Sequence, residues 1–293
     1  MGALPLAKMM TPLLLLMAFA CGDSQSAEPA PVAEGHPWIA EEDFDPGNFH
    51  RSTTIDNRWF PLVPGTRFTW KGQATVDGKR VSRAVVLTVT DLTKTIDGVR
   101  TLVAWDRDYT AGVAEEVELA FFAQDDGGNV WYLGEYPEEY EHGKIVKAPA
   151  WLAGVHGATP GVLMQAVPRT GTRSYAEGWG PEVHWNDRAR AYRTDQHTCV
   201  PVGCYHDVVV IDEFSRDEPG AHQLKFYAPG VGGIRVGWRG PKEEEREVLV
   251  LTDLERLDAA AMDQVRERVL QQEARAYRIS DAYARTAPIE GGQ

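Results

Sequence analysis

The chain has few cysteines, fewer basic than acidic residues and no long apolar run. Three cysteines in 293 residues are too few for a fold held together mainly by disulfides. Thirty Lys and Arg face 43 Asp and Glu, which gives a net charge of −13. This balance argues against nucleic-acid binding, because neutralising phosphates needs clustered basic residues. The composition, 43% hydrophobic and 25% charged, is that of an ordinary globular chain.

The N-terminus has the pattern of an export signal. Lys8 supplies a positive charge, and an apolar stretch runs from Leu13 to Ala20, too short to span a membrane. Ala18 and Ala20 are small residues at the −3 and −1 positions, which favours cleavage after Ala20. We therefore expect residues 1–20 to be a signal peptide. Its removal takes away one basic residue and leaves 273 residues with a net charge of −14.

Cys21 would then be the first residue of the mature chain. A cysteine at this place resembles the lipobox of bacterial lipoproteins, in which the thiol receives a diacylglyceryl group. That motif usually has Leu where this chain has Ala18, so cleavage without lipidation is the alternative. Residues 22–35 are rich in Gly, Ser, Ala and Pro, typical of a flexible tether. The sequence predicts a protein of the bacterial cell envelope, lipid-anchored to the membrane through a tether over residues 21–47, or a secreted protein if Cys21 is not lipidated.

Residues 48–256 have the pattern of a mainly β domain. Short segments rich in β-branched and aromatic residues alternate with Gly, Pro, Asn and Asp, and Asp-Gly pairs at 77–78 and 97–98 favour hairpin turns. Strands about ten residues apart, without helical periodicity between them, predict a curved antiparallel sheet, a barrel or a half-barrel. The expected strands cover 66–70, 83–90, 100–106, 116–123, 129–132, 205–212, 223–227, 233–238 and 247–254.

The C-terminal residues 257–293 are expected to form a helix and a tail. From Ala259 to Tyr283 apolar residues recur at helical spacing, and Asp258 is a suitable N-cap. We expect this helix to pack on or beside the sheet. A helix that binds a partner protein, as in a structural envelope protein, is the alternative.

Two cysteines and two histidines surround a short turn. If Val200 to Gly203 form the turn, His197, Cys199, Cys204 and His206 share one face of a two-stranded ribbon. Because exported thiols are readily oxidised, we expect a Cys199–Cys204 disulfide. The alternative is a zinc or copper site made by the two thiolates and the two imidazoles, and each arrangement excludes the other.

Standard catalytic motifs are absent. The chain has no Gly-x-Ser-x-Gly elbow, no His-Glu-x-x-His helix and no P-loop. Residues 125–129 lack the spacing of a calcium loop and are expected to form a hairpin turn. The sequence therefore predicts no cofactor and leans against an enzyme. A carboxylate-dependent hydrolase that uses Glu135 or Asp125 with His142 or His156 is kept as an alternative.

Aromatic residues are dense in the β-rich part. Burial of apolar surface in the concavity of a curved sheet would bind a small apolar or aromatic ligand, with a few polar groups fixing its orientation. We expect such a ligand to contact four aromatic residues, Trp105, Phe122, Trp131 and Tyr227.

Four segments also carry a resemblance. In order they are residues 55–66 (IDNRWFPLVPGT), 123–135 (AQDDGGNVWYLGE), 160–164 (PGVLM) and 227–232 (YAPGVG). Together they resemble a group of exported bacterial proteins of unassigned function, from about Asn57 to Leu254. The resemblance implies a β-rich, curved-sheet fold like that of the lipoprotein-carrier half-barrels. It implies no catalytic residues.

Overall fold

The computed structural model describes residues 42–291. The predicted signal peptide, Cys21 and most of the predicted tether lie outside these residues. Two residues of the segment 42–47, which the sequence analysis assigned to the tether, contact the barrel. The Glu42 carboxylate accepts a hydrogen bond from the Ala176 amide at 2.9 Å, and the Phe44 ring packs against Trp131. Nearby, a 3-10 turn, η1 (Pro46–Asn48), begins after its N-cap Asp45.

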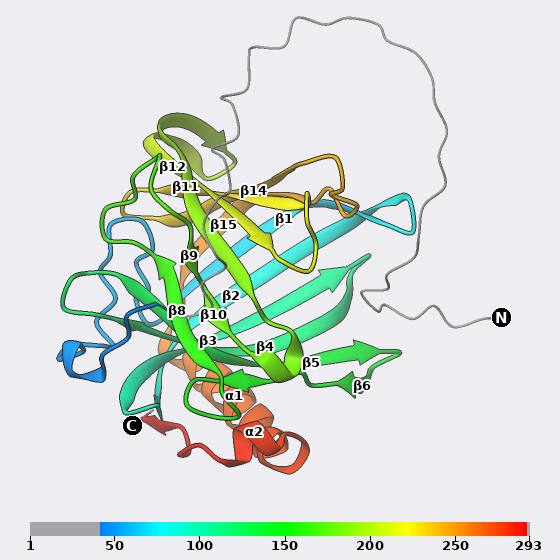
Figure 1. The fold of residues 1–293 in the computed structure, drawn as a ribbon. Helices are drawn as coiled ribbons and strands as arrows, with labels where there is room; N and C mark the ends of the chain where they lie inside the picture. The colour runs from blue at the N-terminus through cyan, green and yellow to red at the C-terminus, as the bar shows by residue number, and fades with distance from the viewer. Residues whose placement is uncertain (1–41, 292–293) are drawn as a thin grey trace, which may run out of the picture. The chain divides into compact units, whose positions relative to one another are not determined.

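The described residues form a mainly β fold, as predicted, with one antiparallel sheet of sixteen strands. Figure 1 shows the curvature of this sheet. The strands are β1 (Thr66–Val76), β2 (Lys79–Ile96), β3 (Val99–Thr110), β4 (Val113–Gln124), β5 (Val130–Glu141), β6 (Lys144–Lys147), β7 (Trp151–Leu152), β8 (Thr159–Met164), β9 (Tyr175–Ala176), β10 (Gly178–Trp179), β11 (Asp187–Val200), β12 (Gly203–Ser215), β13 (His222–Ala228), β14 (Gly232–Arg239), β15 (Val248–Arg256) and β16 (Glu290–Gly291).

One short segment closes the sheet into a nearly complete barrel. The strand order runs from β10 and β8 at one end to β11 and β9 at the other. Strands β9 and β10 are consecutive in the chain, and they pair with opposite ends of the sheet: β9 with β11, and β10 with β8. Between them, the Glu177 amide donates to the Asp187 carbonyl at 2.9 Å. Residues 175–179 therefore join the two edges, and Glu177 lies at the junction.

The predicted strands and turns are confirmed. Each of the nine expected segments lies in an observed strand or overlaps it, and most of the observed strands are longer. Asp77 and Gly78 both have positive φ, as do Asp97 and Gly98, which is the conformation that a two-residue hairpin of this type requires. For β11, the sequence analysis expected only the short part beside the turn at 200–203. It did not predict the short strands β6 to β10 or β16.

The C-terminal helix lies against the outer face of β2 to β5 (Figure 1). Helix α1 (Ala259–Ile279) buries Val265, Val269 and Ala276 against the sheet, so its apolar face is used within the chain. The expected end at Tyr283 was wrong. Ser280 leaves the helical conformation, and its hydroxyl accepts from the Tyr283 amide at 3.2 Å, which starts a second helix, α2 (Asp281–Ala284). Within residues 42–291, neither helix has the length and apolar character needed to cross a membrane.

Replacing the helix N-cap should destabilise the barrel measurably. The Asp258 carboxylate accepts from the Ala261 amide at 2.8 Å, and Asp258→Ala should lower the free energy of unfolding by about 1 kcal/mol. Asp258→Asn, which keeps the acceptor, is the matched control and should lose much less. Urea denaturation measures both. Equal losses for the two variants would show that the cap does not act through this hydrogen bond.

Candidate functional site: carboxyl groups in the barrel interior

The outward and inward faces of β3 and β4 differ sharply. On the outward face, the Trp105 indole donates to Gln272 of α1 at 3.0 Å, and Phe121 packs against Tyr283 with ring centroids 6.2 Å apart. Side chains alternate along a strand, so Asp106 and Glu118 point to the opposite face. A closed barrel has its interior on that face, and the interior of this one therefore contains acidic groups.

Four of these carboxyl groups lie in directly opposed pairs. Asp106 is opposite Glu118, and Asp108 is opposite Glu116, on the neighbouring strands β3 and β4. Like charges in opposed positions of an antiparallel pair repel each other. Arg83 of β2 offsets part of this repulsion, because its guanidinium contacts Asp108 at 3.0 Å. The same guanidinium also pairs with Glu115 and Glu247, so one cation serves three carboxylates.

Glu118 and Glu135 meet at the hydroxyl of Tyr132. The Tyr132 Oη lies 3.0 Å from Glu118 Oε1 and also contacts Glu135 Oε2. A hydroxyl has a single proton to donate, so hydrogen bonds to both carboxyl groups at once require that one of the two be protonated and donate to the tyrosine oxygen. Burial raises the pKa of Glu135 to about 8 and that of Glu118 well above its usual range. These shifts favour the protonated form of the carboxyl groups on this side of the barrel.

A second group of ionisable residues lies near the segment that closes the barrel. Glu213 of β12 pairs with Lys225 of β13 at 2.5 Å. Burial raises the pKa of Glu177 well above its usual range, and the nearby Glu213 carboxylate raises it further. On the far strand β3, burial raises the pKa of Asp106 to about 6, and the positive charge of Lys225 partly opposes this rise. The two groups therefore belong to one electrostatic cluster.

Several polar atoms of this cluster are buried without a partner. Within residues 42–291, Glu177 Oε1, Glu213 Oε1 and the Tyr175 hydroxyl have no hydrogen-bond partner. Glu177 and Tyr175 are each 3% exposed. A buried polar atom without a partner costs about 1–3 kcal/mol, and such atoms are usually satisfied by water or a ligand. These atoms therefore indicate where a bound molecule would make polar contacts.

Aromatic rings line the same interior. Phe60 packs edge-on against both Phe122 of β4 and Tyr227 of β13, with ring centroids 5.7 and 6.0 Å apart. Strands β4 and β13 are not neighbours in the sheet, so these contacts run across the interior. Phe122 also stacks on Tyr132 at 4.9 Å. The rings thus lie directly beside the carboxyl pair of Glu118 and Glu135.

Of the four aromatic residues expected to contact a ligand, the structure brings together two. Phe122 and Tyr227 share Phe60 in the interior. Trp105 lies on the outward face against α1. Trp131 packs on Phe49 with centroids 6.0 Å apart, and its indole donates to Asp125 at 2.8 Å.

The four residues named for a hydrolase have separate surroundings. Glu135 faces the interior beside Tyr132. Asp125 lies in the turn between β4 and β5 and accepts from the Asn129 amide, as the predicted hairpin turn requires. His142 lies in the turn between β5 and β6, and His156 pairs with Asp281 of α2 at 2.9 Å.

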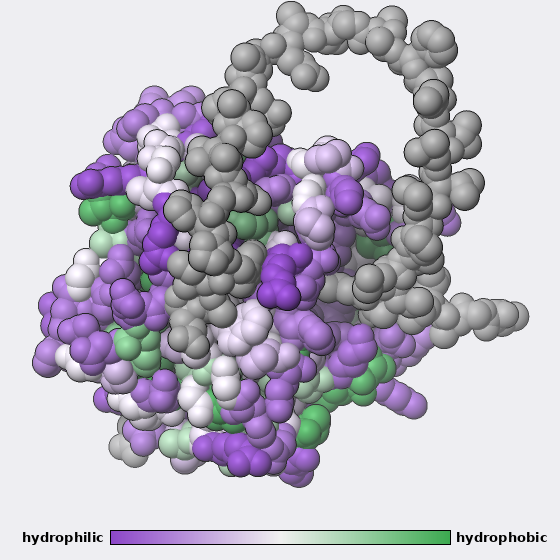
Figure 2. All heavy atoms as spheres, viewed as in Figure 1, coloured by the Kyte–Doolittle hydropathy of each residue, from purple (hydrophilic) through white to green (hydrophobic). Residues whose placement is uncertain are grey.

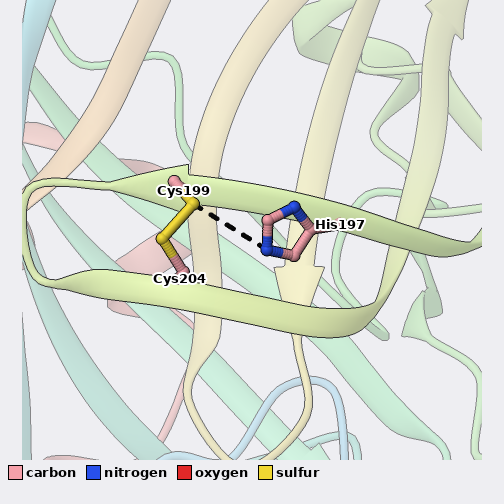
Figure 3. Close-up of a disulfide and its surroundings, with 3 residues drawn as sticks. All are labelled: His197, Cys199 and Cys204. Carbon is pink, nitrogen blue, oxygen red and sulfur yellow. Dashed lines mark hydrogen bonds between the residues drawn. A yellow bond between two sulfur atoms is a disulfide. The ribbon is translucent and has the colours of Figure 1, made fainter.

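The predicted disulfide is confirmed. Cys199 and Cys204 are directly opposed on β11 and β12 and are joined through their sulfurs, as Figure 3 shows. His197 lies beside Cys199 on the same face (Figure 3), with 3.8 Å between Nε2 and Sγ. The His197 and His206 rings lie 4.5 Å apart. In this oxidised form the sulfurs cannot act as thiolate ligands.

Comparisons with known proteins find similar solved structures, among them two from bacteria. A protein described as exported, with a YmcC-like fold, from Bacteroides fragilis is 16% identical, has a TM-score of 0.41, and covers 68% of this chain and 100% of its own. A protein described as a lipoprotein from Parabacteroides distasonis is 14% identical with a TM-score of 0.33 and the same coverage. No family model and no curated protein matches the chain. A likeness of this size assigns neither a family nor a function.

The protonated interior predicts a pH-dependent stability. Burial raises the pKa of Glu135 to about 8, of Glu116 to about 7 and of Asp106 to about 6, whereas the unfolded chain has carboxyl pKa values near 4. Between pH 5 and pH 8, unfolding therefore releases protons, and stability falls as the pH rises. We expect a loss of several kcal/mol over this window, with a decrease in Tm of about 2–4 °C for each kcal/mol.

Calorimetric Tm values between pH 5 and pH 8 test this sign, and Glu135→Gln should flatten the profile. Glu244→Gln, on the exposed loop before β15, is the matched control and should leave it unchanged. Burial also raises the pKa of Glu118, Asp108 and Glu177, which adds to the same trend. Asp91, whose pKa Arg266 lowers, acts below the window. Lys94, whose pKa burial lowers to about 8, opposes the trend only at the upper end of the window. A Tm that rises from pH 5 to pH 8 would contradict the protonated interior.

Proposed function

We propose that this protein is an exported, lipid-anchored barrel whose interior binds an amphipathic organic cation. The sequence analysis expected an apolar or aromatic ligand, and the aromatic contacts of Phe60, Phe122 and Tyr227 support an apolar body. The observation that carries the proposal is the surplus of buried and half-buried carboxyl groups in the same interior. Among the described residues, no basic side chain forms an ion pair with Asp106, Glu118 or Glu135. Export and the anchor on Cys21 rest on the N-terminal sequence.

An ammonium group fits this interior better than a neutral head group would. Burial disfavours the charged carboxylates and keeps them protonated. A ligand cation would remove that penalty, because it lets a carboxyl group ionise and accept a charge-assisted hydrogen bond. The ligand's apolar body would displace water from the aromatic rings. The same cation could also contact the face of Tyr132 or Phe122.

The spacing of the carboxyl groups favours an organic cation over a metal ion. Metal ligation needs several ligand atoms close together, and within residues 42–291 no three of the interior carboxyl groups bring their oxygens within 4.8 Å of one another. The groups are instead spread over β3, β4, β5, β12 and the segment that closes the barrel. A polyatomic cation with several N–H donors can reach separated acceptors.

Isothermal titration calorimetry with three ligands that share one body tests the proposal. We would compare 4-phenylbutylamine, 4-phenylbutan-1-ol and 4-phenylbutyrate, which differ in the charge of the head group. The amine should bind about 10- to 100-fold more tightly than the alcohol, because this is the contribution of one charge-assisted hydrogen bond to affinity. The carboxylate should not bind. An alcohol that binds as tightly as the amine would overturn the proposal and favour a purely apolar ligand.

A further inference from the structure

The tip of the β11–β12 hairpin presents four metal-binding side chains to solvent. His197, Cys199, Cys204 and His206 are all exposed, and register and alternation place them on one face. The opposite face of the hairpin packs inward, where Thr198 is buried and Tyr205 contacts the core. The four side chains can therefore move without disturbing the core.

The distances between these side chains are close to those of a tetrahedral metal site. Zinc bonds of about 2.3 Å to sulfur and about 2.0 Å to nitrogen place sulfur and nitrogen ligands about 3.5 Å apart. Here Cys199 Sγ and His197 Nε2 are 3.8 Å apart, and the ligand atoms of His197, Cys199 and Cys204 all lie within 4.8 Å of one another. The His206 ring lies 4.5 Å from that of His197, but its nitrogens lie outside this group, so the His206 side chain would have to rotate to act as a fourth ligand.

We propose that reduction of the Cys199–Cys204 disulfide creates a zinc site of two thiolates and two imidazoles on this hairpin. A dithiol reductant gives two electrons and two protons to the disulfide and becomes a disulfide itself, while the protein gains two thiols. Zn²⁺ then binds both sulfurs, and the two thiol protons pass to solvent. The sulfurs move from the bonded distance of 2.05 Å to about 3.8 Å, which exposed side chains can do by rotation.

The same residues give the oxidised form a much weaker site. When the sulfurs are bonded to each other, only the two imidazoles remain as ligands, and the coordination of the metal must be completed by water. Two extra thiolates add both charge and soft donors, which zinc prefers. The disulfide therefore sets the metal affinity of the hairpin, and this role is independent of any ligand in the barrel interior.

Titration of the full-length protein with Co²⁺ and Zn²⁺, before and after reduction, tests the proposal. Reduced protein should develop the intense visible absorption of tetrahedral cobalt with thiolate ligands, and Zn²⁺ should displace it. We expect reduction to raise the affinity about 100-fold or more. Equal affinities in the two redox states, or cobalt absorption without the sulfur-to-metal band, would overturn the proposal.

Variants assign the ligands. His206→Ala in the reduced protein should lower the affinity about tenfold or more and change the visible cobalt spectrum, and Cys199→Ser/Cys204→Ser should abolish the sulfur-to-metal band. His142→Ala, in the hairpin turn between β5 and β6, is the matched control and should change neither. A His206→Ala protein with the wild-type spectrum and affinity would exclude the proposed ligand set. Because the first comparison uses unaltered protein, it stands even if a variant folds poorly.

Discussion

Arg275→Met is expected to lower the free energy of unfolding by about 3–5 kcal/mol, because it leaves a buried carboxylate without its cation. Glu138 of β5 has a side chain that is 0% exposed, and Arg275 of α1 contacts both of its oxygens, at 2.9 and 2.8 Å. The hydroxyls of Tyr136 and Tyr140 donate to the same carboxylate at 3.1 and 2.6 Å. This pair joins the helix to the sheet.

Guanidinium denaturation at pH 7 measures the loss. Arg268→Met, at an exposed position of the same helix, removes an arginine without a buried partner and should cost less than about 0.5 kcal/mol. Adding Glu138→Gln to Arg275→Met should recover part of the stability, because a neutral amide is less costly to bury than a charge. If Arg275→Met matched Arg268→Met, the ion pair would not hold the helix on the sheet.

Glu177→Gln is expected to weaken binding of 4-phenylbutylamine by about 10- to 100-fold. Glu177 lies where the barrel closes, is 3% exposed, and has a carboxyl oxygen without a partner among the described residues. An ammonium group at this oxygen would gain a charge-assisted hydrogen bond, and it would interact favourably with the nearby Glu213 charge. An amide at position 177 keeps the shape but loses the charge.

Two readouts separate lost charge from lost structure. Glu177→Asp should retain part of the affinity, and the exposed Glu244→Gln should retain all of it. Burial raises the pKa of Glu177, so wild-type protein should release protons when the amine binds, which calorimetry in buffers of different ionisation enthalpy detects. Wild-type affinity in Glu177→Gln would place the ammonium group elsewhere.

The strands were predictable because their chemistry is local. Val, Ile and aromatic residues mark them, and turns such as Asp77-Gly78 need residues that tolerate positive φ. Strand β11 gave a weaker signal: its inward positions include the small residues Ala189 and Ala191, which are buried, and most of its other positions are charged or polar. Small buried residues beside arginine resemble a polar loop in a sequence window.

The candidate site was harder to predict, since it depends on which face of each strand turns inward. Asp106 and Glu118 alternate with Trp105 and Leu119, and in a sheet with one solvated face the charged side would be the outer one. Here the C-terminal helix covers the apolar face, so the charged face points inward. The sequence predicted aromatic residues in the interior, and Phe122 and Tyr227 lie there. No local feature of the sequence distinguished these two residues from Trp105, which lies on the outward face against α1.

The most direct test of the central claim is a crystal structure of the protein with 4-phenylbutylamine. The account predicts the phenyl ring beside Phe122 or Tyr227 inside the barrel, and the amine nitrogen within hydrogen-bond distance of at least one carboxyl group among Glu118, Glu135 and Glu177. A ligand bound only on the outer surface, or one inside the barrel with its nitrogen turned away from every carboxyl group, would contradict it.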